Sequence, residues 1–360
     1  MRRGGRPSDG FGFAELLVGL SIGLVAVAAI VVELRASVRA VQTQGETVDL
    51  VQRVRAVAES VAGAIADAGS GFTRASPSGW VSVAAPRVVP GRFAVRTTDP
   101  THTAFDDRIT VLSAQQAPGA STLAMPMGTP DGLLSIAPLP GCRLASPTCD
   151  LGVGDLALVG DRHGHTDLVE ITAVSGNLLA HEPALLSHAY DPADRVRVIP
   201  LEARAFVFDA AAAQVREYRG RSQALVMADD VVGFHVRYFG TPEPPSGREF
   251  VPGHDTCVNT ADGRPRLSVL APDAGRLVEL TPDLLADGPY CGAGLFGFDA
   301  DLLRVRLVRL TLRVQASDPA VRGRSPALFA RPGWAADRGL EVPDREVTLD
   351  VALRNSLTVG

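Results

Sequence analysis

The chain has 360 residues, of which 46% are hydrophobic and 21% charged, and its formal net charge is −5. This composition is typical of a folded protein and excludes bulk disorder. The negative net charge argues against a large basic surface, so we expect no nucleic-acid partner. All 35 basic residues are arginine, which excludes chemistry that needs a lysine, such as a Schiff base.

One apolar segment near the N-terminus is long enough to cross a membrane. Between residues 11 and 32 the only charged residue is Glu15, and a bilayer core of about 30 Å needs roughly 20 helical residues. Arg2, Arg3 and Arg6 precede the segment. Because basic residues beside a span favour the cytoplasm, we expect a cytoplasmic N-terminus and an exported remainder.

An exported chain would carry its four cysteines into an oxidising compartment, where disulfides persist. These cysteines are Cys142, Cys149, Cys257 and Cys291, and four cysteines allow three pairings. Closure of the shortest loops favours Cys142 with Cys149 and Cys257 with Cys291. The alternative is four free thiols in the core.

The apolar segment has three interpretations, each with a different mature product. A signal peptide would use Leu16–Val25 as its apolar region and residues 26–28 as its cleavage site. A plain anchor would leave the chain intact. Cleavage after Gly10 would instead give Phe11 a free α-amine and make Glu15 the fifth residue. A carboxylate inside a bilayer is costly and usually has a partner, which the α-amine of a neighbouring subunit would supply.

The residues around this third cleavage position resemble the processing site of type IV prepilins and pseudopilins. Gly10, Phe11 and Glu15 match the family position by position, whereas residues 12–14 differ from its usual ones. The resemblance implies that prepilin peptidase removes residues 1–10 as a leader peptide and that the new N-terminal Phe11 is methylated. It also implies that Glu15 guides addition of the subunit to a fibre.

The sequence after the apolar segment predicts one long helix. No proline occurs between Pro7 and Pro77, and apolar residues recur at steps of mostly three and four. These residues are Leu34, Val38, Val41, Val48, Val51, Val54, Ala58, Val61, Ile65 and Ala68. Gly69 would then end the helix. We expect a helix over residues 11–70, membrane-spanning over 11–32 and amphipathic over 33–70, and the alternative is a coiled-coil stalk.

Beyond residue 71 the apolar period changes to two, which predicts β-strands. Alternation is clear at Val232–Tyr238 and Val347–Leu353, and a change of parity between Leu303 and Val314 predicts a bulge near Val308. Further expected strands are Phe93–Thr97, Arg108–Ser113, Asp155–Val159, Leu168–Val174 and Arg204–Phe208. The predicted fold class is α+β, a long N-terminal helix packed on a β-rich head over residues 71–360, the layout of pilins.

Several segments of this head are similar to PilW-type minor pilins. In chain order they are Asp155–Val159, Leu168–Val174, Asp230–Tyr238 and Val351–Asn355. The resemblance implies a low-abundance type IV pilus subunit that primes assembly. Its implied partners are prepilin peptidase, other minor and major pilins, the inner-membrane assembly platform and, before assembly, membrane lipid.

The same resemblance implies a location in the inner membrane, with a periplasmic head, followed by transfer into a pilus or pseudopilus. A type II secretion pseudopilin related to pseudopilin J is the alternative within this class, although pseudopilin J is usually shorter. The alternative from another class is a membrane-anchored extracytoplasmic binding protein whose helix is only an anchor.

One segment carries candidate metal ligands. Asp161, His163, His165 and Asp167 alternate, so an extended strand would place two imidazoles and two carboxylates on one face, a donor set that suits Zn²⁺. The favoured interpretation is a polar hairpin tip around Gly164, without a metal.

Other candidate chemistry is equally sparse. A row of arginines predicts a solvent-facing strand edge rather than a phosphate site; it comprises Arg304, Arg306, Arg309 and Arg313. The sequence contains no His-Glu-x-x-His and no Cys-x-x-Cys motif. We therefore expect a structural subunit with no catalytic residues and no cofactor.

Overall fold

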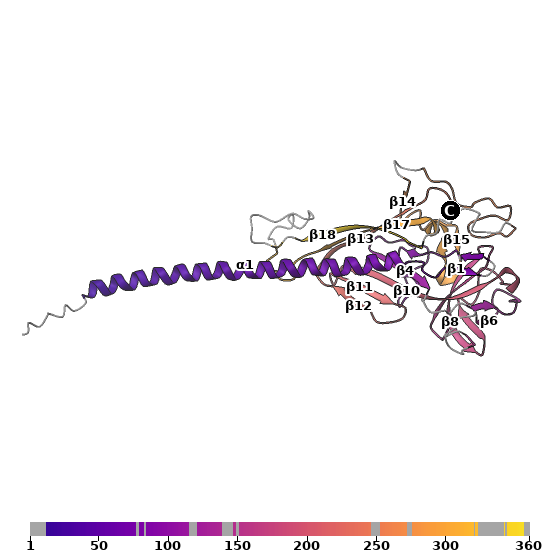
Figure 1. The fold of residues 1–360 in the computed structure, drawn as a ribbon, viewed down its shortest axis with the longest axis horizontal. Coiled ribbons are helices and arrows are strands. Elements are labelled where there is room, and N and C mark those ends of the chain that lie inside the picture. The colour runs from indigo at the N-terminus through magenta and orange to yellow at the C-terminus, as the bar shows by residue number, and fades with distance from the viewer. Residues whose placement is uncertain are drawn as a thin grey trace, which may run out of the picture. The chain divides into compact units, whose positions relative to one another are not determined.

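The computed structural model describes residues 12–76, 79–82, 84–114, 121–138, 147–148, 151–245, 253–271, 276–319, 321–322, 342 and 344–355. Within these residues, one long α-helix is followed by β-strands, short 3₁₀ turns and loops (Figure 1). The chain divides into two units, one of residues 1–51 and 316–344 and one of residues 52–315 and 345–360. From here on, "head" means this second unit, which differs from the residue range 71–360 expected from the sequence.

Helix α1 runs without a break from Phe13 to Asp67, a length of 55 residues and about 82 Å at 1.5 Å per residue. It ends where the sequence predicts. Gly69 has a φ of 71°, the left-handed conformation that commonly follows a helix and that glycine adopts without strain. Its amide N–H bonds to the carbonyl of Leu112 at 2.8 Å, which turns the chain into the head.

The first half of α1 is apolar and exposed. None of its most apolar 18-residue stretch is buried. Among the described residues, α1 alone is long and apolar enough to cross a membrane. The protein thus has an N-terminal helix that suits a single membrane crossing by length and composition.

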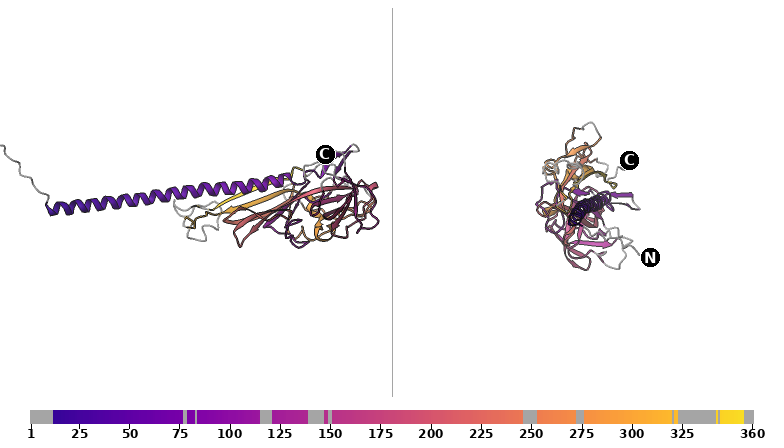
Figure 2. Two further views of the ribbon diagram at one scale, coloured as in Figure 1. Left: turned by 90° about the horizontal axis from the view of Figure 1, so that it is seen from below. Right: turned by 90° about the vertical axis from the view of Figure 1, so that its left-hand side faces the viewer.

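The last turns of α1 belong to the core of the head. One face is buried at helical spacing; it comprises Val54, Val57, Ala58, Val61, Ala64, Ile65 and Ala68. The side-chain amide of Asn355 donates to the carbonyls of Asp67 and Ala68, so the chain's C-terminal segment caps the helix end. The left view of Figure 2 shows these turns alongside the strands of the head.

The larger sheet of the head is antiparallel and has ten strands in the described residues. Its strands are β3 (Val88–Val89), β4 (Arg108–Ala114), β5 (Ser121–Leu123), β6 (Leu134–Pro138), β7 (Leu156–Gly160), β8 (Thr166–Ser175), β9 (Leu178–Glu182), β10 (Arg197–Asp209), β11 (Gln214–Arg219) and β12 (Leu225–Ala228). The first half of β10 pairs with both β5 and β7, and its second half pairs with β4 and β11. Since β5, β6, β9, β8 and β7 pair in that order, β10 closes a ring of six strands.

A hydrophobic cluster draws on all six strands of this ring. It includes Leu123, Ile136, Val159, Val169, Leu179 and Val198. Tyr190, from the segment between β9 and β10, joins the cluster and is fully buried. The ring therefore fixes the hairpin between β7 and β8 against the segment that leads into β10.

The smaller sheet has the strand order β14 (Val278–Leu280), β13 (Val231–Gly240), β17 (Val305–Val314) and β18 (Arg345–Ala352). Phe239 pairs with Leu307 but Gly240 pairs with Val305, so the predicted bulge exists and lies at Arg306, two residues before the expected position. A Cβ on Gly240 would lie 2.6 Å from the carbonyl oxygen of Arg304, which explains why glycine stands opposite the bulge.

The remaining elements are short. Two two-stranded sheets pair β1 (Thr73–Ser76) with β2 (Gly79–Ser82) and β15 (Tyr290–Cys291) with β16 (Phe298–Asp299). The 3₁₀ turns are η1 (Pro192–Asp194), η2 (Gly294–Phe296) and η3 (Ala300–Arg304). The coarse prediction of an α+β protein with a long apolar N-terminal helix and a β-rich domain is confirmed.

One predicted strand is wrong. Residues 93–97 form a loop, because Ala94 and Thr97 have φ values of 54° and 62°, which are incompatible with an extended strand. The loop is closed by the Arg92 guanidinium, whose Nη2 and Nε donate hydrogen bonds of 2.7 and 2.9 Å to Asp99 Oδ1. Its apolar side chains are nevertheless buried, which explains the misleading pattern.

The prediction of an arginine-lined strand edge is also wrong. Strand β17 lies between β13 and β18, and Arg309 forms an ion pair with Asp350 across the β17–β18 pairing. Arg304 is buried in η3, with its Nε 2.8 Å from Asp301 Oδ1. Burial raises the pKa of the Asp301 carboxyl to about 6. Alternation predicted β18 itself, but β18 follows a long intervening segment, so its pairing with β17 could not be deduced from local sequence.

Candidate functional site

The first candidate site is the start of α1. Glu15 lies in the first helical turn and is exposed, and its Oε2 accepts a hydrogen bond of 3.0 Å from the backbone N–H of Gly12. This carboxylate therefore caps the helix N-terminus, where negative charge is also favoured by the helix dipole. The predicted processing residues Gly10 and Phe11 lie outside the described residues.

The helix surface that follows Glu15 is uniformly apolar. The exposed large side chains are Phe13, Leu16, Leu17, Val18, Leu20, Ile22, Leu24, Val25, Val27, Ile30, Val31 and Val32. Such a continuous apolar surface is unfavourable in water and indicates contact with lipid or with other apolar helices. Gly19 and Gly23 lie four residues apart within it, and a Cβ at either would meet no atom within 4 Å.

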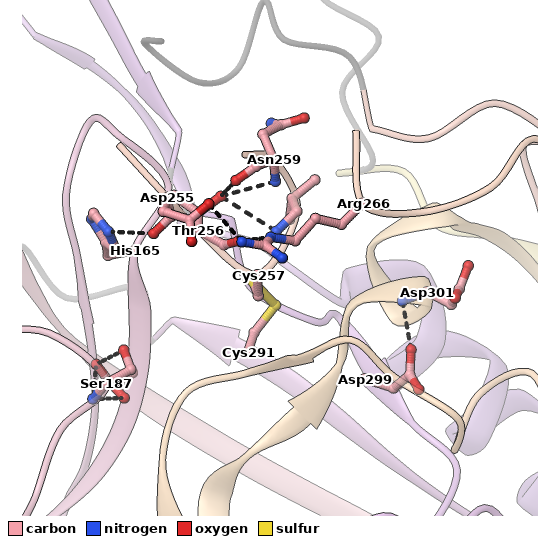
Figure 3. The surroundings of a disulfide bond; sticks show 12 residues. His165, Ser187, Asp255, Thr256, Cys257, Asn259, Arg266, Cys291, Asp299 and Asp301 are labelled. Atoms are coloured by element: carbon pink, nitrogen blue, oxygen red, sulfur yellow. Dashed lines mark hydrogen bonds and ion pairs between the residues drawn. A yellow bond between two sulfur atoms is a disulfide. The ribbon is translucent and has the colours of Figure 1, made fainter. Parts of the chain in front are cut away.

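The predicted disulfide between Cys257 and Cys291 is confirmed (Figure 3). The two Cα atoms are 5.1 Å apart, and 34 positions separate the residues in the chain. Cys291 belongs to β15 and Cys257 to a loop over residues 253–271. The other predicted pair, Cys142 and Cys149, lies outside the described residues.

Hydrogen bonds fix the Cys257 loop on both sides of the disulfide. The Thr256 hydroxyl accepts from the backbone N–H groups of Val258 and Asn259, and the Arg266 side chain donates to the Thr256 carbonyl and to the Asp255 carboxylate. Figure 3 shows this network beside the disulfide. These hydrogen bonds hold the loop in one conformation beside the β7–β8 turn, where the Asp255 carbonyl contacts His165.

Removal of the disulfide is expected to destabilise the head. Cross-linking residues this far apart stabilises a protein by about 2–4 kcal/mol, mainly by restricting the unfolded chain. The variant Cys257→Ser/Cys291→Ser should therefore unfold at lower denaturant concentration than the oxidised wild type, as followed by circular dichroism. Equal midpoints for the two proteins would contradict a structural role for this bond.

The second candidate site is the turn between β7 and β8. The predicted hairpin is present, with Gly164 at a φ of 96°. Asp161 Oδ1 accepts hydrogen bonds from the backbone N–H groups of His163 and His165 at 2.8 and 3.0 Å. Asp161 Oδ2 lies 2.7 Å from Nδ1 of His165. This turn is not a solvated polar tip, because Asp161, His163 and Asp167 are buried.

Two further histidines from distant segments meet this hairpin. We call the group of His163, His165, His188 and His254 the histidine cluster. The rings of His165 and His188 stack with centroids 4.0 Å apart, and those of His163 and His254 with centroids 3.6 Å apart. His165 Nε2 also lies 3.2 Å from the carbonyl oxygen of Asp255 in the disulfide-bonded loop (Figure 3).

Burial and ion pairing shift the pKa values in the cluster. Burial alone would raise the pKa of Asp161, but the hydrogen bond and charge of His165 outweigh it and lower the pKa. Burial would lower the pKa of His165, yet Asp161 raises it overall. Burial and the nearby His165 lower the pKa of His188. Burial raises the pKa of Asp167, although Ser187 and Tyr190 donate hydrogen bonds to it.

One ligand atom each of Asp161, His165 and His188 lies within 4.8 Å of the other two. Sequence reasoning found Asp161 and His165 through their alternation, but it missed His188 and His254. Both lie outside any local motif. Four of the chain's seven histidines meet in this cluster, and they do so only because the folded ring of strands brings distant segments together.

Two short motif matches lie in settings that do not suit the chemistry they suggest. Gly19–Gly23 reads Gly-x-Ser-x-Gly, but Ser21 is within α1 and its hydroxyl bonds to the carbonyls of Leu17 and Val18. Gly292–Gly297 reads Gly-x-Gly-x-x-Gly, but it joins β15 to β16 through η2. Neither segment has the strand–turn–helix context that these motifs require.

The chain matches no protein-family model, no curated protein and no solved structure. The resemblance to pilins therefore depends on the residues around position 10 and on the short head segments. The geometry of α1 and of the histidine cluster is independent of that resemblance.

Proposed function

We propose that this chain is a minor subunit of a type IV pilus, which prepilin peptidase processes after Gly10 and which enters the fibre through its N-terminal helix. The observation that carries the proposal is the division of α1 into two parts. The first part is apolar and wholly exposed, whereas the last turns are buried in the head. One continuous helix would thus link a membrane-inserted segment to a folded exported domain.

Membrane lipid would cover the exposed apolar surface before assembly, and the helices of neighbouring subunits would cover it afterwards. Both environments are apolar, so transfer between them costs little hydrophobic free energy. The pair Gly19 and Gly23 would allow another helix to approach closely, as small residues four apart do in membrane helices. The basic residues before position 11 would hold the N-terminus in the cytoplasm until cleavage.

Glu15 would act as the guide for subunit addition. Before cleavage its carboxylate has a local partner in the Gly12 N–H. After cleavage, the α-amine of Phe11 on a neighbouring subunit would provide an opposite charge. An ion pair in this low-dielectric setting is much stronger than one in water, so it would favour subunits in the correct axial register.

The proposal is tested by following a tagged chain in cells that assemble the pili. The chain should occur in the sheared fibre fraction, in small amount relative to the major subunit, and it should be lost from that fraction when the assembly ATPase is inactivated. A chain confined to the membrane fraction in both strains would contradict the proposal and favour a plain anchor.

A further inference from the structure

We propose that the histidine cluster is a binding site for a divalent transition-metal ion of the Zn²⁺ class, with Asp161, His165 and His188 as ligands. This inference rests on the head alone and does not depend on the proposed pilus function. It also revises the sequence-based expectation that the turn around Gly164 holds no metal.

The first argument is convergence. Three segments far apart in sequence supply the cluster: the β7–β8 turn, the stretch before η1 with His188, and the loop with His254. The Cys257–Cys291 disulfide ties the third segment to the β15–β16 hairpin. Gly292, next to Cys291, packs against the start of β8, where a Cβ would lie 3.4 Å from the Thr166 carbonyl oxygen. A disulfide therefore fixes the His254 loop relative to β15, which lies next to the start of β8.

The second argument is the spacing and type of the donors. The three ligand atoms lie within 4.8 Å of one another, and tetrahedral Zn²⁺ with bonds near 2.05 Å needs donors about 3.4 Å apart. Asp161 Oδ2 and His165 Nδ1 share a hydrogen bond of 2.7 Å, so binding through these two atoms would release the shared proton to solvent. Side-chain movements of the order of 1 Å would then bring the three donors to the required spacing. Imidazole and carboxylate donors suit Zn²⁺, Cu²⁺ or Ni²⁺ better than Ca²⁺ or Mg²⁺, which prefer sets of oxygen ligands.

The third argument is charge and hydrogen bonding. Asp161, Asp167 and Asp194 surround the cluster, and in the described part of the chain no arginine forms an ion pair with any of them. His163 Nε2 lies 2.9 Å from Asp194 Oδ1, while its Nδ1 is buried without a hydrogen-bond partner among the described residues. His163 is not one of the three proposed ligands, and its contact with Asp194 holds its ring beside the site.

Access and orientation fit the same role. Asp161 is buried, but His165 and His188 are partly exposed, so an ion would reach the site from solvent. His188 has ring contacts with His165 and Tyr190 and lies on the accessible side. It is therefore the ligand whose replacement disturbs the described hydrogen bonds least.

The test uses the full-length chain, purified in detergent, stripped with a chelator, loaded with Zn²⁺ and freed of excess ion by gel filtration. We expect about one Zn²⁺ per wild-type chain by elemental analysis and a rise in melting temperature on loading. The His188→Gln variant should bind Zn²⁺ on the order of 100-fold more weakly, since even second-shell changes cost 10- to 100-fold. The matched control is His235→Gln, because His235 is an exposed histidine of β13 in the smaller sheet, 3.5 Å from a carboxylate oxygen of Asp106.

A second measurement needs no variant. Co²⁺ bound to the wild-type chain should give visible absorption that one equivalent of Zn²⁺ abolishes. The inference is overturned if the wild type retains no Zn²⁺ and shows no displaceable Co²⁺ absorption. It is equally overturned if the His188→Gln variant, folded as judged by its metal-free melting temperature, binds Zn²⁺ as tightly as the wild type.

Discussion

Replacement of Glu15 by glutamine is expected to lower incorporation of the chain into fibres by on the order of tenfold or more, while membrane insertion stays unchanged. Glutamine removes the charge but keeps an oxygen that can accept the Gly12 N–H, so the helix stays capped. A loss of about 1.4 kcal/mol in subunit pairing already corresponds to a factor of ten. The ratio of tagged chain in the fibre and membrane fractions measures this effect.

Two further variants separate charge from capping. Glu33→Gln removes a carboxylate from an exposed position of the same helix, just beyond the apolar segment, and should incorporate normally. Glu15→Ala loses both the charge and the cap and should be at least as impaired as Glu15→Gln. Normal incorporation of Glu15→Gln would show that the residue acts only as a cap, and the guidance mechanism would then be wrong.

Introduction of a carboxylate at Val61 is expected to prevent folding of the head. Val61 is fully buried on the face of α1 that packs into the head core. An unpaired buried charge costs several kcal/mol, which is comparable to the whole stability of a typical domain, about 5–15 kcal/mol. The Val61→Asp chain should lose its cooperative unfolding transition and become sensitive to protease.

The matched control is Val48→Asp, which places the same charge on the same helix at a residue 57% exposed and should leave the unfolding midpoint close to that of the wild type. Ile65→Ala tests the same packing more mildly, because truncation of a buried isoleucine costs about 2–5 kcal/mol. That variant should fold with a lower midpoint. A wild-type midpoint for Val61→Asp would refute the view that α1 is an integral part of the head.

The regular parts of the fold could be predicted because their signals are local. The absence of proline, the three- and four-residue apolar steps and the glycine at position 69 together predict α1 to within three residues of its end at Asp67. Strands β13 and β18 follow from strict alternation. The loop at residues 93–97 shows the limit of such patterns, because the consecutive apolar residues Phe93, Ala94 and Val95 are buried there although the backbone has positive φ at Ala94 and Thr97.

The non-local features could not be predicted. The position of β17 between two strands depends on β18, whose register pairs Arg309 with Asp350. The histidine cluster depends on closure of the ring of strands and on the Cys257–Cys291 bond, which together bring His188 and His254 to the β7–β8 turn. Alternation at Asp161–Asp167 identified His163 and His165. It could not show that Asp161, His163 and Asp167 are buried, because that depends on segments distant in sequence.

The most direct test of the pilin account is the mature N-terminus, determined by intact mass and terminal sequencing in cells with and without prepilin peptidase. The account predicts a chain that begins at Phe11 and carries one additional methyl group, and an uncut chain when the peptidase is absent. A start at Ala29 would identify a secreted protein with an ordinary signal peptide. An intact Met1 start despite active peptidase would contradict the account and leave α1 as a plain anchor.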